Sequence, residues 1–149
     1  MDGIRRKDSV LSRSRSMPAN ADAVFDVLSD LDNMTTWLPD SIEVELSGPN
    51  LIRLWLPGLH ADVDVERQVT IDWERLRITW GSETTTSCNG TLQVLRLTAG
   101  RSAVSVRLTG PPGASRSAVD TWVESALDAL ETVVADECRT KQAVHQPVL

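Results

Sequence analysis

Residue types that commonly build catalytic and metal sites are scarce in this sequence of 149 residues. It contains two cysteines, two histidines and no tyrosine. No H-E-x-x-H motif and no paired-cysteine spacing is present, so we expect neither a metal nor another cofactor. No motif supports a Ser-His-Asp or Cys-His arrangement either, so no catalytic residue is assigned. The sequence leaves enzymatic activity undecided.

Long apolar stretches are also lacking. None approaches the roughly 18 residues of a membrane span, so we expect no stable membrane insertion. The basic, serine-rich segment 1–18 has no apolar core of the kind found in a secretory signal, which predicts a cytoplasmic protein. Cys88 and Cys138 are then expected to be small buried hydrophobes and not a disulfide. The net charge of −6 argues against nucleic-acid binding.

What is present is mostly an alternation of apolar and polar residues, which is typical of half-buried β-strands. Two segments, 21–31 and 117–138, instead carry apolar residues at helical spacing. A short helical turn follows the first of them and ends before Pro39. The expected strands are 9–17, 41–48, 51–57, 61–71, 76–82, 90–97 and 102–108.

Strands that are segregated from helices predict an α+β fold and not a parallel, doubly wound one. A sheet of about seven antiparallel strands with one amphipathic helix on its inner face should curl around that helix. The early helices would fill the gap where the curled sheet does not close, leaving a hollow beside the long helix. We expect one domain over 9–139, a flexible arm at 1–8 and a loose tail at 140–149.

The segment 14–39, together with 65–82, 90–110 and the final helix, resembles the START-related superfamily. The similarity is to its polyketide cyclase/dehydrase and lipid-transport branch, often called SRPBCC. Members show a strand ending in a hydrophobic residue and a proline, then a VF-x-x-L-x-D helix and a tryptophan near W-x-P. The corresponding residues are Met17-Pro18, Val24-Phe25 with Leu28 and Asp30, and Trp37-Leu38-Pro39.

The resemblance implies a helix-grip fold with an internal cavity for an apolar or amphipathic molecule. Three functions stay open. The protein could bind or carry a lipid, polyketide or other hydrophobic metabolite, or it could be a cyclase/aromatase that acts by positioning in the same cavity. It could also be a ligand-free module that forms a homodimer through an exposed Trp55 or Trp73. A cavity smaller than about 300 Å³ would count against the first two.

Arginines on expected inward faces are the main polar candidates for ligand binding. Arg67 lies in a file of valines, and a buried guanidinium needs a carboxylate, carbonyl or water partner. It could fix an anionic group of a ligand, or lie near a rim and pair with an acid such as Asp26. Arg13 and Arg15 share a face of the first strand and pose the same question, unless Ser12, Ser14 and Ser16 face inward instead.

Apolar and aromatic residues complete the expected ligand contacts. Trp80 and Trp122 lie on inward faces by pattern, and Trp37 ends the helical segment that would close the hollow. Each of the three could be a flat pocket wall or simply core. The remaining predicted contacts are Leu54, Val65, Val69 and Ile78.

Overall fold

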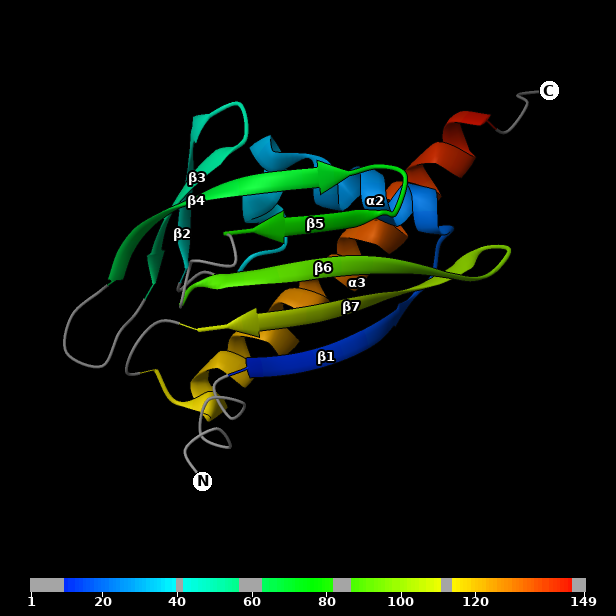
Figure 1. Ribbon diagram of the computed structural model, residues 1–149. Coiled ribbons are helices and arrows are strands. Elements are labelled where there is room, and N and C mark those ends of the chain that lie inside the picture. The colour runs from blue at the N-terminus through cyan, green and yellow to red at the C-terminus, as the bar shows by residue number, and fades with distance from the viewer. Residues whose placement is uncertain (1–9, 40–41, 57–62, 82–86, 111–113, 146–149) are drawn as a thin grey trace.

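The computed structural model describes residues 10–39, 42–56, 63–81, 87–110 and 114–145. The expected N-terminal arm lies outside these residues. Seven strands, two α-helices and one 3₁₀ helix follow one another in the order expected from the sequence (Figure 1). The elements are β1 (Val10–Met17), α2 (Ala21–Ser29), η1 (Leu31–Thr36), β2 (Glu43–Gly48), β3 (Leu51–Leu56), β4 (Val63–Asp72), β5 (Arg77–Trp80), β6 (Asn89–Thr98), β7 (Arg101–Thr109) and α3 (Arg116–His145).

The strands form one antiparallel sheet in the order β1-β7-β6-β5-β4-β3-β2. From β2 to β7, each strand pairs with the next strand in the chain, and β1 joins the far edge beside β7. The strands β1 and β2 are therefore the two edges, and the sheet does not close into a barrel. Figure 1 shows α3 crossing one face of this curled sheet, with α2 on the same face.

The early helical segment fills the open side of the sheet, as its sequence pattern predicts. In α2, the apolar stripe Ala21, Val24, Phe25 and Leu28 is buried. The following helix η1 contacts both the edge strand β2 and α3, so it bridges the gap that the sheet leaves open. This α+β helix-grip arrangement is the predicted fold.

The helix α2 begins as expected but is not capped by its N-cap side chain, and α3 extends further than expected. Asn20 occupies the N-cap position of α2, but its side chain accepts a hydrogen bond from the backbone N–H of Gly100 (2.6 Å) instead of capping the helix. Gly100 has φ +76° in the β6–β7 turn, a conformation that favours glycine. The helix α3 continues to His145 and is not interrupted near Cys138. The proposed tail at 140–149 is therefore helical as far as His145, and its last four residues lie outside the described part.

The core lies between the inner face of the sheet and the three helices. One stripe of α3, including Val123, Leu127 and Leu130, packs against inward residues of the central strands. Alternation along β4 is as predicted, since Val69 is buried while Gln68 and Thr70 are exposed. Burial of apolar side chains from both layers stabilises the grip of the sheet on the helix.

Candidate ligand-binding site

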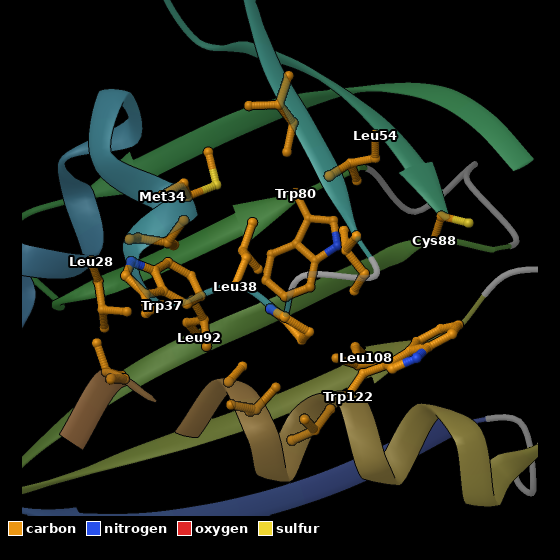
Figure 2. A pocket seen from close by; sticks show the side chains of 18 of the residues that line it. Leu28, Met34, Trp37, Leu38, Leu54, Trp80, Cys88, Leu92, Leu108 and Trp122 are labelled. Carbon is orange, nitrogen blue, oxygen red and sulfur yellow. The ribbon is translucent and has the colours of Figure 1, made fainter. Parts of the chain in front are cut away.

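A cavity of about 160 Å³ lies where the sheet, η1 and α3 meet (Figure 2). Leu28 and Met34 contribute from the early helices, and Trp37, Leu38 and Pro39 from the segment after η1. The strands, residues directly flanking them and α3 provide the rest of the lining, with Leu31 at the start of η1: Ile42, Ile52, Leu54, Val69, Ile78, Trp80, Cys88, Leu92, Val106, Leu108, Thr109, Gly110, Val119, Trp122, Val123, Ala126, Leu127 and Leu130.

The cavity wall is almost wholly apolar. No Asp, Glu, Lys, Arg or His belongs to the described lining, and its polar side-chain groups are the indole N–H groups, the thiol of Cys88 and the hydroxyl of Thr109. Burial raises the pKa of the Cys88 thiol, more than its contacts with Ser87 and Arg67 lower it, so the thiol is neutral at pH 7. Charged ligands would find no compensating charge here.

The volume is small for a ligand pocket. Common pockets for small molecules measure about 300–1,000 Å³. The cavity is smaller than about 300 Å³, which counts against both a carrier and a cyclase for large ligands such as a lipid chain or a long polyketide. However, an engineered protein cavity of about 150 Å³ binds benzene. The space is therefore sufficient for a molecule about the size of one aromatic ring.

Trp37 is the most enclosed of the cavity tryptophans, with 7% of its surface exposed. Its backbone N–H donates to the carbonyl of Met34 (3.2 Å), which sets the end of η1. The indole Nε1 is buried and donates no hydrogen bond to any described residue. Figure 2 shows the ring among the lining side chains, with Nε1 on the edge toward Leu28 in this view.

Trp80 is held in place by a close backbone approach. A Cβ added at Gly90 would lie 2.6 Å from the ring of Trp80 and 2.6 Å from the carbonyl oxygen of Arg107. Only a residue without a side chain leaves room for the indole on this strand. Trp80 pairs with Gly90 across β5 and β6, so the glycine lets the ring lie over its neighbouring strand and face the cavity.

Arg67 is half-buried on the inner side of β4, but it is not part of the cavity lining. Its guanidinium donates to three backbone carbonyl oxygens, those of Glu66 (2.7 Å), Ser87 (2.9 Å) and Cys88 (3.2 Å). Cys88 has φ +54°, which is an unfavourable backbone conformation for a residue with a Cβ. The observed contacts of Arg67 thus hold the strained segment beside the cavity, and no acid such as Asp26 is among its partners in the described chain.

Arg13 and Arg15 point from β1 toward α3 and also lie outside the cavity lining. The alternating serines Ser12, Ser14 and Ser16 are exposed. Arg13 forms an ion pair with Asp120 (2.8 Å). Arg15 contacts three carboxylates of α3, at 2.6 Å for Asp128, 3.2 Å for Glu131 and 3.5 Å for Glu124.

Six of the ten predicted ligand contacts are brought together around one cavity, and their contact with a ligand stays a prediction. The six are Leu54, Val69, Ile78, Trp37, Trp80 and Trp122. Val65 and the three arginines are not part of the lining. The sequence candidates omitted Leu92, Val106 and Leu108, although alternation in 90–97 and 102–108 could have indicated that they share a face. Cys88 and Gly110 follow no periodic pattern that could have indicated them.

The two tryptophans considered for a protein interface both have intramolecular partners. The guanidinium carbon of Arg53 lies 5.1 Å from the centroid of the Trp55 ring. Trp73 is 56% exposed, and its ring packs edge-on against Phe25 with centroids 4.7 Å apart.

No cluster of His, Cys, Asp and Glu suited to a metal ion occurs among the described residues. None of the helices in the described chain has the length and apolar character needed to cross a bilayer.

The fold and this cavity define a helix-grip protein with an internal apolar pocket. A family model described as "Polyketide cyclase / dehydrase and lipid transport" matches residues 10–135. The chain belongs to this family. A search among curated proteins gives no match.

Several solved structures share this fold. TTHA0849 from Thermus thermophilus is 23% identical, with 86% of this chain and 98% of that chain covered and a TM-score of 0.61. The Zhui aromatase/cyclase from a Streptomyces species is 19% identical, with 87% and 93% covered and a TM-score of 0.58. A START superfamily protein from Mycobacterium smegmatis is 14% identical, with 85% and 97% covered and a TM-score of 0.62. At these identities the similarity establishes the fold alone.

Proposed function

We propose that this protein binds one small, neutral, apolar molecule in the cavity between the sheet and α3. The observation that carries the proposal is an apolar space of about 160 Å³ whose described lining contains no charged residue. Transfer of an apolar ligand of matching size from water into this cavity is favourable, and an apolar ligand has no polar group that would lose its hydrogen bonds to water. Family membership supports a role in binding hydrophobic molecules.

The engagement of the arginines supports a neutral ligand. Arg67 donates to backbone carbonyls, while Arg13 and Arg15 pair with carboxylates of α3. A ligand carboxylate in the cavity would be buried without a counter-charge, which is strongly unfavourable. The cavity should therefore bind a neutral ring compound more tightly than its carboxylate analogue.

The structure offers less support for a cyclase. General acid–base catalysis needs a group that exchanges protons near the working pH. Cys88 is the only thiol, carboxyl, imidazole or amine group in the described lining, and burial raises its pKa. A linear polyketide also exceeds a volume of about 160 Å³. Binding without turnover is the function that these features favour.

Calorimetric titration with toluene tests the proposal. Ala126 and Ala129 are both half-buried on α3, but only Ala126 lines the cavity. We expect toluene to bind the wild type. It should bind the Ala126→Leu variant at least tenfold more weakly, because the added carbons fill the cavity. The Ala129→Leu variant should bind toluene almost as tightly as the wild type does. Equal binding to Ala126→Leu and wild type, or no binding to wild type, would contradict the proposal.

A further inference from the structure

The indole N–H of Trp37 is a buried hydrogen-bond donor that no described residue accepts. The side chain is 93% buried, since 7% of the residue is exposed, and its Nε1 has no partner among the described residues. A buried donor without a hydrogen bond is unfavourable, and buried Trp N–H groups usually have a partner. A residue of the cavity wall thus carries a covered polar group whose bonding capacity no described residue uses.

The surroundings of Trp37 offer little to a solvent molecule. A buried water typically needs two to four polar partners. Apart from the indoles, Thr109 and Cys88 are the only side chains in the described lining with polar atoms; Thr109 ends β7 and Cys88 directly precedes β6, whereas Trp37 follows η1. A ligand that brings its own acceptor needs one partner only, and its remaining surface can contact the apolar wall.

Trp37 also stands on the least regular wall of the site. It directly follows η1, a 3₁₀ helix in which Asn33 departs from helical geometry (φ −109°, ψ 20°). Such helices have weaker hydrogen-bond geometry than α-helices. Neighbouring atoms cover Nε1 in this conformation, so contact with a ligand requires the ring to turn about its side-chain bonds.

We infer that the bound molecule carries a neutral hydrogen-bond acceptor, a carbonyl or ether oxygen, and that this oxygen accepts the N–H of Trp37. The inference rests on the proposed function and adds a polarity to the ligand. Trp37 is then a specificity-determining residue: it orients a ring-sized ligand within an otherwise featureless apolar cavity. Ligands that lack an acceptor still enter, but leave the N–H unpaired.

Two probes of nearly identical shape test this role. Acetophenone and α-methylstyrene are both planar ring compounds, and they differ in having a carbonyl oxygen or a CH₂ group at the same position. Calorimetry with wild type and the Trp37→Phe variant gives four affinities. We expect the variant to weaken acetophenone binding about tenfold more than α-methylstyrene binding, because only acetophenone loses a hydrogen bond. Trp122→Phe, which alters another lining indole, should change both affinities by the same factor.

The outcomes separate the inference from the proposed function. If wild type binds α-methylstyrene and the Trp37→Phe variant changes both affinities equally, the cavity binds ligands and the role of Trp37 is overturned. The same holds if the preference for acetophenone is lost in Trp122→Phe instead. If wild type binds neither probe, the proposed function fails and the inference fails with it.

A measurement on unmodified protein covers the case in which Trp37→Phe does not fold. In ¹⁵N-labelled wild type, each of the five tryptophans gives one indole N–H resonance. Acetophenone should move the Trp37 resonance downfield, as formation of a hydrogen bond does, and α-methylstyrene should not. A resonance that responds alike to both probes would overturn the inference.

Discussion

The two sides of α3 meet the rest of the protein through opposite chemistry. On one side, Val123, Leu127 and Leu130 are buried against the sheet and help to line the cavity. On the other side, carboxylates of α3 form ion pairs with the guanidinium groups of Arg13 and Arg15 on the edge strand β1. The apolar side therefore holds the helix by exclusion of water, while the charged side holds it by ion pairs at the surface.

Because the two sides of α3 differ in this way, effects on stability can be separated from effects on ligand binding. Burial of apolar area is worth far more than a solvent-exposed ion pair, so the cavity side should dominate the free energy of unfolding. The ion pairs instead fix where α3 lies along β1. A change on the charged side should leave ligand binding intact, whereas a change on the apolar side alters stability and cavity together.

Leu130→Ala should have the largest effect. Leu130 is 1% exposed and lines the cavity, so truncation removes buried contacts and enlarges an existing void. We expect a loss of about 3 kcal/mol in the free energy of unfolding, measured by urea denaturation. Ser125→Ala, at an exposed position of the same helix, should stay within about 0.5 kcal/mol. A loss below about 1 kcal/mol for Leu130→Ala would show that the apolar side is not the main anchor.

Much of this contrast can be predicted from the sequence, because helical periodicity assigns residues to faces. The apolar stripe of α3 and its acidic stripe are both evident at helical spacing. What lies opposite each stripe is less accessible to sequence reasoning. An acidic stripe is typical of a solvated helix face, and these carboxylates are indeed partly exposed, but Asp120 and Asp128 also pair with arginines more than 100 residues earlier in the chain. Local pattern shows the face of a residue but not its distant partner.

Arg67 is a second residue whose face, but not its partners, can be predicted from the sequence. Its inward position follows from alternation along β4, and its need for partners follows from the unfavourable burial of a charge. Two of its observed partners are the backbone carbonyls of Ser87 and Cys88, 20 and 21 residues away in the chain. Every residue has a carbonyl, so no residue type in the sequence could indicate which ones an arginine binds.

Replacing Arg15 by Met should have a smaller effect than the core truncation. Arg15 is 24% exposed and faces three carboxylates, which repel one another once it is removed. We expect a loss of about 0.5–1 kcal/mol at low salt, because partly exposed ion pairs contribute little. Added salt should destabilise the wild type slightly and stabilise the variant, since it screens attraction in one and repulsion in the other.

The control for this substitution is Arg107→Met, at an exposed position of β7. It removes the same charge without leaving the three α3 carboxylates unneutralised. Denaturation at a series of salt concentrations distinguishes the two variants. An identical salt dependence in Arg15→Met and Arg107→Met would mean that net charge alone matters, and that the ion pairs between β1 and α3 hold nothing in place.

Alkaline pH should produce the smallest effect, and it acts on the cavity side. Burial raises the pKa of the Cys88 thiol, so between its unfolded and folded pKa values the unfolded chain has lost this proton and the folded protein retains it. The unfolded state binds fewer protons there, which makes stability fall as pH rises. The stability linked to this thiol is thus complete below the unfolded pKa, near 8.5, and decreases as pH rises from there toward the folded pKa.

Cys88→Ala removes this titration and keeps the same unfavourable backbone conformation, since both residues carry a Cβ at φ +54°. We expect the free energy of unfolding of wild type to decline more steeply than that of the variant between about pH 8 and pH 10. Bound toluene should also protect the thiol from alkylation, because the ligand would occupy the space that Cys88 lines. Parallel pH profiles would show that the thiol reaches solvent in the folded protein. The cavity would then be open at this wall, whereas the ion-paired side of α3 would be unaffected.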